Sequence, residues 1–241
     1  RDCSEEREHS QIAGLFDSVA KSSSFHVVQL IQQEQAAASD VRVVEMPKLP
    51  AMTMIKSQHD ESTYTRWIID YVDKGTFGDV YKAYNPIAQR QEAAKVVRFV
   101  DRQGKPIDNA ERIERLRSQL DEAEIMLELG PHPTLVAIRG ILLLRNMQDA
   151  SGEAVADNLF VFMDYVELSG CMKDTILDTK VRLARQVACG LVHIQQCFPN
   201  LESIHWDVKP SNILVECARD ADGELIPKTA KISDFGKAMT T

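Results

Sequence analysis

The sequence lacks a long apolar run and an excess of basic residues. No stretch approaches the roughly 18 apolar residues that a membrane-spanning helix requires, and no charged segment followed by an apolar one opens the chain as a signal peptide would. The net charge of −8 argues against a general binder of nucleic acid or anionic membrane, because phosphate groups attract basic surfaces. We expect a soluble intracellular protein, cytoplasmic or nuclear, with neither nucleic acid nor membrane as a partner.

The cysteines lack a motif. None of the five stands in Cys-x-x-Cys spacing, so the sequence favours neither a zinc site nor a disulfide framework, and we expect a reducing compartment. The composition, 44% apolar and 27% charged over 241 residues, is typical of a globular protein with a packed core. Because the chain begins with Arg1, we expect it to be processed or cut from a longer one.

Residues 1–63 form an N-terminal extension that differs in composition from the rest. They are rich in Gln, Ser, Ala and Glu, and the prolines Pro47 and Pro50 indicate a linker. Apolar residues at helical spacing over 12–19 and 27–31 predict two short amphipathic segments. A helical tail packed on the next domain is favoured over a dedicated partner-docking helix, and both remain open.

A polar loop over residues 204–212 runs into an apolar strand at 213–215, and Asp-Phe-Gly follows at 234–236. Such a loop at the end of a rigid strand presents side chains to a substrate. Lys209 can neutralise a transferring anion, while Asn212 and Asp234 offer oxygen atoms that suit a hard divalent cation. Phosphoryl transfer needs this set of groups.

These two segments resemble the catalytic loop and metal-binding triplet of eukaryotic protein kinases, His-Arg-Asp-Leu-Lys-Pro-x-Asn and Asp-Phe-Gly. The lysine two residues after Asp207 is the serine/threonine-kinase form, whereas Trp206 stands where the family usually has arginine. The resemblance implies that Asp207 is the catalytic base, that Lys209 assists it, and that Asn212 and Asp234 bind Mg²⁺.

The resemblance also implies a structural role for His205. It would lie in a core column with Phe235, Met126 and Ile138. A role for His205 as a metal ligand is disfavoured, because the sequence offers it no partner ligands.

From Tyr64 the pattern becomes β-rich and predicts a hairpin, with strands at 67–72 and 80–84 and a glycine-rich turn at 74–78. Glycines let a backbone approach phosphate oxygens, although alone this pattern favours an ordinary hairpin turn. The kinase loop is Gly-x-Gly-x-x-Gly-x-Val, and here Asp73 replaces the first glycine. We expect ATP affinity to be reduced and not abolished.

Lys95 lies in an apolar strand, Ala93 to Val100, where a lysine requires an anionic partner. The resemblance to the Val-Ala-Ile-Lys strand implies that Lys95 contacts the α- and β-phosphates and pairs with Glu122 of the next helix, with Glu124 as an alternative. That helix is predicted from Asp108 to Leu129. Asp108 and Glu111 have capping-box spacing, and Gly130-Pro131 ends the helix.

Strands at 136–144 and 159–163, separated by a polar insertion at 146–157, precede a segment that resembles the kinase hinge. The resemblance implies that Met163 lies behind the adenine and that the backbone of Asp164 to Val166 hydrogen-bonds it. A helix over 179–195 then leads to the catalytic loop. The full set of ATP-binding residues that the resemblance implies is Val72, Lys74, Gly75, Gly78, Val80, Ala93, Lys95, Met163, Asp164, Val166 and Leu214.

The predicted fold is α+β and kinase-like, with a complete β-rich N-lobe and hinge at 64–166 and an incomplete helical C-lobe at 167–241. Because no activation segment or Ala-Pro-Glu motif follows Gly236, we expect an inactive fragment of a longer kinase that lacks its protein-substrate elements. The predicted function is Mg²⁺-dependent transfer of the ATP γ-phosphoryl group to serine or threonine of a protein. Asp73 and Trp206 motivate the alternative, a pseudokinase or ATP-binding interaction module, whereas the Asp-x-Lys-Pro-x-Asn form disfavours a small-molecule phosphotransferase.

Overall fold

The structure is a computed structural model of the chain, and it describes residues 53–55, 66–75, 78–101, 103–144, 147–148, 154–155, 158–167, 176–198 and 207–236. The predicted N-terminal helical segments and linker, and also His205 and Trp206, lie outside the described residues. The described residues form two compact units. Unit 1 contains those up to Leu120 and Arg139–Met163, and unit 2 contains Asp121–Ile138 and those from Asp164 onward.

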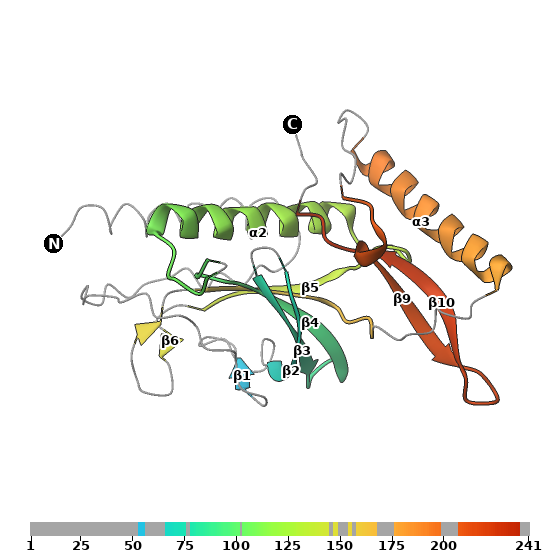
Figure 1. The fold of residues 1–241 in the computed structure, drawn as a ribbon, viewed down its shortest axis with the longest axis horizontal. Helices are drawn as coiled ribbons and strands as arrows, with labels where there is room; N and C mark the ends of the chain where they lie inside the picture. Colours follow the sequence, from blue (N-terminus) through green and yellow to red (C-terminus); the bar gives the residue numbers. More distant parts are fainter. Residues whose placement is uncertain are drawn as a thin grey trace. The chain divides into compact units, whose positions relative to one another are not determined.

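A six-stranded sheet forms the basis of unit 1 (Figure 1). The strands in spatial order are β1 (Thr53–Ile55), β2 (Arg66–Lys74), β3 (Gly78–Asn85), β4 (Arg90–Val97), β8 (Asn158–Asp164) and β5 (Ile138–Leu144). The first four strands pair antiparallel in chain order. β2 and β3 therefore form the predicted hairpin, and the glycine-rich segment joins them.

Alternation along the strands determines which side chains form the core of unit 1. Tyr81 and Ala83 of β3 face the same way as Ala94 and Val96 of β4, because side chains alternate along a strand and opposite residues of a pair share a face. All four are buried, and the cluster that they join is completed by Ile68, Leu142, Phe160 and Phe162. The other face of β3 and β4 is thus available for other contacts.

One charged side chain is fully buried in the sheet. The Glu92 carboxylate accepts hydrogen bonds from Arg66 Nε at 2.6 Å, Asn85 Nδ2 at 2.9 Å and Arg90 Nε at 2.9 Å. A charge with 0% exposure is tolerated only with such partners. The group joins β2, β3 and β4 at the end of the hairpin that is remote from the glycine-rich turn.

Helix α2 (Asn109–Leu129) confirms the predicted helix. The N–H of Glu111 donates to Asp108 Oδ1 at 2.9 Å, as an N-cap requires, and Gly130 takes a φ of 63° just beyond the helix, where a left-handed residue ends many helices. In unit 1, Gln119 Nε2 donates to the carbonyl oxygens of Lys95 at 3.1 Å and Leu159 at 3.2 Å. The first half of α2 is thereby attached to the sheet.

The predicted strand through Val100 ends earlier, at Val97. The chain folds back on itself there, because Ile107 N donates to Phe99 O at 3.0 Å and Val100 forms a bridge with Pro106. The extra residues of this loop, at 101–107, thus make a small turn of their own.

In unit 2, helix α3 packs on an antiparallel hairpin (Figure 1). α3 spans Leu177–Cys197, close to the predicted 179–195, and the hairpin contains β9 (Ile213–Arg219) and β10 (Leu225–Ile232). Ala230 N donates to Gln186 Oε1 at 2.8 Å, so a side chain of α3 satisfies a backbone group of β10. A 3₁₀ turn, η1 (Pro210–Asn212), precedes β9.

Val136 and Ala137 were predicted to begin β5, but that strand begins at Ile138. Val136 N donates to Ile232 O at 2.9 Å and Ile232 N donates to Thr134 O at 2.8 Å. Thr134 and Val136 are therefore paired with β10, which lies in the same unit.

Smaller features complete the description. The predicted polar insertion contains a short antiparallel hairpin, β6 (Met147–Gln148) and β7 (Ala154–Val155). Among the described residues, no helix has both the length and the apolar character to cross a membrane. Cys189 and Cys197 are free thiols, whereas Cys217 is disulfide-bonded, which the scattered cysteine spacing had not predicted.

Candidate active site

The polar loop before β9 is organised by Asn212. This side chain is buried, with 5% exposure, and its Nδ2 donates both to Asp207 O at 3.0 Å and to Asp207 Oδ2 at 3.2 Å. Asn212 N also donates to Lys209 O at 2.9 Å. One asparagine therefore fixes the conformation of the loop and the orientation of the Asp207 carboxylate.

Lys209 and Asp207 form a close ion pair. The Nζ to Oδ2 distance is 2.6 Å, the Lys209 side chain is 47% exposed, and the Asp207 side chain is 16% exposed. The hydrogen bond to Asp207 raises the pKa of Lys209, so the lysine stays protonated at neutral pH. The structure thus brings a shielded carboxylate and an accessible cation together in this loop.

Ser233 connects the same loop to Asp234. Ser233 N and Oγ donate to Asn212 O at 2.9 and 3.0 Å. Asp234 follows with an exposed side chain and a φ of 62°, a left-handed conformation that aspartate tolerates better than most residues. The two oxygen-bearing residues predicted to bind metal are therefore tied to one hydrogen-bonded frame.

Glu122 and Asp234 flank Gly236. A β-carbon at Gly236 would lie 3.4 Å from Asp234 Oδ1 and 3.5 Å from Glu122 Oε2. Glu122 is buried, at 6% exposure, whereas Glu124 is half-buried and has its pKa raised by burial and by Asp121 and Glu128. The carboxylates of Asp234 and Glu122 therefore both lie beside the glycine of the triplet.

The donor set suits Mg²⁺. Because Asn212 uses Nδ2 on Asp207, its Oδ1 is the atom left to face a cation, and Asp234 supplies a carboxylate. Such hard oxygen ligands match Mg²⁺, which usually takes one or two protein ligands and completes its shell with phosphate and water. In the described part of the chain, no group of three or more His, Cys, Asp or Glu side chains could hold a metal by itself.

In unit 1 the sheet brings several of the predicted ATP-binding residues together. Val80 pairs with Lys95, and Lys82 pairs with Ala93. These four side chains therefore share the face of β3 and β4 opposite to the core cluster. Val72 and Lys74 are exposed at the end of β2, and Gly78 is buried at the start of β3.

The predicted hinge residues occupy the end of β8 and the segment after it. Met163 is half-buried in unit 1, whereas Val166, at 8% exposure, and half-buried Leu214 belong to unit 2. Asp164 N donates to Ala137 O at 2.9 Å, and Asp164 Oδ2 accepts from Ala137 N at 3.3 Å. The Asp164 side chain thus connects the start of the hinge to the backbone of Ala137, just before β5.

The sequence analysis missed Lys231. Its Nζ lies 3.2 Å from Asp164 Oδ2 and 3.4 Å from Leu135 O, and the side chain is only 15% exposed. A lysine inside the strand that leads to Asp-Phe-Gly was the available signal, because a shielded lysine requires an acidic partner. The Lys95–Glu122 pair joins residues of different units and stays a prediction.

Unit 2 therefore holds a carboxylate, a lysine and oxygen atoms that suit a metal ion in one hydrogen-bonded loop. Unit 1 holds a glycine-rich hairpin. Phosphoryl transfer needs these groups. Comparison with known proteins agrees: residues 68–241 match the protein kinase domain family, and the chain belongs to that family. The predicted eukaryotic protein kinase domain and its α+β class, with an antiparallel sheet in the N-lobe, are thereby confirmed.

Individual relatives are moderately similar. The chain is 30% identical over 179 residues to cyclin-dependent kinase 11.1 of Caenorhabditis elegans, covering 70% of this chain and 21% of that protein. It is 27% identical over 173 residues to a probable cell division protein kinase of Encephalitozoon cuniculi, covering 71% and 53%. It is 28% identical over 176 residues to a probable serine/threonine-protein kinase of Arabidopsis thaliana, covering 70% and 25%. The chain thus spans at most 53% of the length of these relatives.

Proposed function

We propose that this chain is the nucleotide-binding and catalytic part of a serine/threonine protein kinase, which transfers the γ-phosphoryl group of ATP to a protein hydroxyl. The observation that carries the proposal is the frame in which Asn212 orients Asp207 while Lys209 lies 2.6 Å from the same carboxylate. The lysine two residues after Asp207 supports the serine/threonine type, as does the similarity to the probable serine/threonine-protein kinase of Arabidopsis thaliana.

In the proposed mechanism, Asp207 orients the substrate hydroxyl and accepts its proton as the phosphoryl group leaves ATP. Lys209 stabilises negative charge on the transferring group from the open side of the loop. Asn212 and Asp234 hold Mg²⁺, which when bound neutralises charge on the phosphate oxygens. Every one of these groups acts by position and charge, as phosphoryl transfer requires.

The nucleotide-binding residues of this proposal are those that the resemblance to protein kinases implies. In unit 1, the shared face of Val80 and Ala93 packs on adenine, and Lys95 contacts the phosphates. The backbone of Asp164 to Val166 hydrogen-bonds adenine, with Met163 behind it.

A pseudokinase, or an ATP-binding interaction module, is the second candidate. Asp73 in place of the first loop glycine and Trp206 in place of the usual arginine favour it. Mg²⁺-dependent binding of ATP by the full-length protein, without transfer to any protein substrate or to itself, would support this candidate and contradict the first.

The test of the first candidate is the Asp207→Asn variant of the full-length protein. Asparagine keeps the shape and can still accept from Asn212, but it cannot take a proton. We expect turnover to fall about 10²- to 10⁴-fold, with the dissociation constant for Mg·ATP within about twofold, because Asp207 acts on the hydroxyl and not on the nucleotide. Turnover close to that of the wild type would exclude Asp207 as the base.

A further inference from the structure

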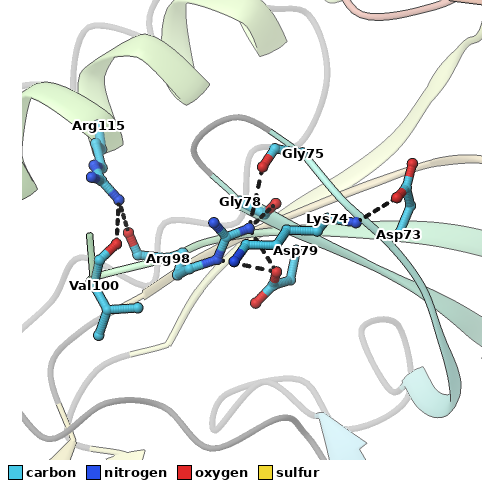
Figure 2. A network of polar contacts seen from close by, with 8 residues as sticks. All are labelled: Asp73, Lys74, Gly75, Gly78, Asp79, Arg98, Val100 and Arg115. Atoms are coloured by element: carbon cyan, nitrogen blue, oxygen red, sulfur yellow. Dashed lines mark hydrogen bonds and ion pairs between the residues drawn. The ribbon is translucent and has the colours of Figure 1, made fainter. Parts of the chain in front are cut away.

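The glycine-rich turn is held from one side by an arginine that the proposed chemistry does not use. Arg98 follows β4, and its Nη2 donates to Gly75 O at 3.2 Å and to Gly78 O at 2.9 Å (Figure 2). These two carbonyls lie at the end of β2 and the start of β3. A single guanidinium group therefore connects the two sides of the hairpin where the turn begins and ends.

An acidic side chain fixes the direction of that guanidinium. Asp79 Oδ1 accepts from Arg98 Nη2 at 2.8 Å and from Arg98 Nε at 3.2 Å (Figure 2). The side chains of Arg98 and Asp79 are only 12% and 23% exposed, respectively. The pair is therefore partly shielded from water, unlike the exposed surface ion pairs that contribute little. Because Asp79 balances its charge, Arg98 acts through geometry and not as a free cation for phosphate.

The main chain of Arg98 is fixed in turn by helix α2. Arg115 Nη1 donates to Arg98 O at 2.7 Å and to Val100 O at 2.9 Å (Figure 2), and Arg115 Nη2 pairs with Glu111 at 2.6 Å. All of these residues belong to unit 1. A continuous set of hydrogen bonds thus runs from the first turns of α2 to the glycine-rich turn.

The glycine itself is required by the same geometry. A β-carbon at Gly78 would lie 2.5 Å from Val96 O, a distance that no alanine could keep. The close approach of β3 to β4 puts the Gly78 carbonyl within reach of the Arg98 fork. Backbone proximity and the arginine therefore act on the same peptide group.

Carbonyl direction matters for a turn that binds phosphate. Carbonyl oxygens carry partial negative charge and repel phosphate, whereas backbone N–H groups attract it. A cation that gathers the carbonyls of Gly75 and Gly78 keeps both away from an anionic ligand. Arginine suits this task because Nε and Nη2 fix its planar group on Asp79 and thereby direct Nη2 at the carbonyls, whereas lysine ends in a compact ammonium on a flexible stem.

We propose that Arg98, oriented by Asp79, is a positioning residue for the phosphate groups of the nucleotide, acting through the Gly75 and Gly78 carbonyls. This inference rests on the proposed ATP-binding function. It assigns no direct contact between Arg98 and substrate. It predicts that Arg98 affects the binding of phosphates and not the binding of the nucleoside.

The test compares the affinities of the full-length protein and its variants for Mg·ATP and for adenosine. Arg98→Met removes the guanidinium group and keeps an unbranched apolar stem. We expect Mg·ATP to bind about tenfold more weakly, a loss of about 1.4 kcal/mol, while adenosine, which has no phosphate, binds within about twofold. Arg98→Lys should lie between wild type and Arg98→Met, because one ammonium keeps the Asp79 pair but not both carbonyl bonds.

Arg90→Met is the matched control. Arg90 lies at the start of β4, remote from the glycine-rich turn, whereas Arg98 follows the end of that strand, and Arg90 also pairs with an acidic residue, Glu92, at 2.9 Å. Arg90→Met should change the affinities for Mg·ATP and for adenosine by less than about twofold. Any loss of stability should affect the two affinities equally. Asp79→Asn should reproduce part of the Arg98→Met effect, and the double variant should be less than additive because the two side chains act as one unit.

The outcomes separate this inference from the proposed function. If the wild-type protein does not bind Mg·ATP, the proposed function fails. If the wild type binds and Arg98→Met binds equally well, only the Arg98 inference fails. Equal losses of ATP and adenosine affinity in Arg98→Met, with a lower melting temperature, would mean that Arg98 only stabilises the fold and would also overturn the inference.

Discussion

Asn212 holds Asp207 through one nitrogen atom, Nδ2, which donates to both the main-chain oxygen and the carboxylate of Asp207, at 3.0 and 3.2 Å. The asparagine therefore has a second role beside the proposed binding of a metal ion. Its amide nitrogen orients the proposed base, and its amide oxygen remains for the cation. A residue with two oxygens or two nitrogens at this position could satisfy only one of these tasks.

Asn212→Asp tests this double use. Aspartate supplies a metal ligand but no donor, and its charge repels Asp207 at about 3 Å. We expect turnover to fall about 10²-fold or more, even at saturating Mg²⁺. Asn85→Asp is the control, since Asn85 is also 5% exposed and also donates to a carboxylate, Glu92 Oε1, at 2.9 Å. It should lower the melting temperature without a matching loss of turnover per folded molecule. Equal turnover losses in both variants would contradict the role of Asn212.

A second prediction concerns the hinge. Lys231 lies 3.2 Å from Asp164 Oδ2, and that carboxylate also accepts from Ala137 N. Lys231→Met removes the cation and leaves a partly buried carboxylate without it, so the backbone that is proposed to bind adenine should be held less firmly. We expect KM for ATP to rise about three- to tenfold with kcat within about twofold, the pattern of lost uniform binding.

Lys228→Met provides the control for the hinge prediction, because Lys228 lies on the same strand β10 with an exposed side chain. KM and kcat should both stay within about twofold of wild type, as for most exposed substitutions. A change in kcat alone in Lys231→Met would instead connect Lys231 to the chemical step and contradict the hinge assignment.

The residues of these two predictions show which features the sequence alone could predict. Asp207, Lys209 and Asn212 lie within six positions of one another, so local spacing alone predicted that they would act together. The boundaries of α2 followed from Asp108 and Gly130 for the same reason, since caps are local signals.

Contacts between distant segments were out of reach. Lys231 and Asp164 are separated by 67 positions and Gln119 and Leu159 by 40. Which buried polar group finds which partner depends on how strands and helices pack, and periodicity carries no information about that. The burial of Gln119 in α2 was likewise out of reach, because a polar residue does not count in an apolar pattern.

A third prediction concerns pH and unit 2. His132 Nδ1 accepts from Thr134 N at 3.3 Å, and its ring stacks on His193 with centroids 4.3 Å apart. Burial, then His193 and Lys231, lower the pKa of His132 from the ordinary value of 6.5. The unfolded chain therefore binds more protons than the folded one in that range, so stability is full above about pH 6.5 and falls as the pH drops toward the folded pKa.

His132→Asn provides the comparison, because its amide oxygen can still accept from Thr134 N but does not titrate. Thermal melting between pH 7.5 and 5.5 should show a smaller decrease in melting temperature for the variant than for wild type. The absolute melting temperature of the variant can be lower at both pH values, since the stacking on His193 is lost. Identical pH dependence in the two proteins would contradict the role of His132.

The last prediction concerns Asp73, the residue in place of the first loop glycine. Its Oδ1 accepts from the N–H of Lys74 at 2.7 Å, and its side chain is exposed at the end of β2 (Figure 2). If nucleotide phosphates lie several ångströms away, two like charges at a surface dielectric cost on the order of 1 kcal/mol. Asp73→Gly should therefore tighten Mg·ATP binding about fivefold, and the gain should shrink at high salt.

Two further variants separate charge from backbone effects at Asp73. Asp73→Asn keeps an acceptor for Lys74 N and removes only the charge, so it should reproduce most of the gain. Asp70→Asn is the matched control, because Asp70 Oδ1 accepts from its own neighbour, Tyr71 N, at 2.8 Å on the same strand. Being three positions farther from the turn, Asp70 should change affinity by less than about twofold, since the charge interaction falls with distance and is screened by salt. Affinity that is unchanged in Asp73→Asn but raised in Asp73→Gly would show that backbone freedom, and not repulsion, limits ATP binding.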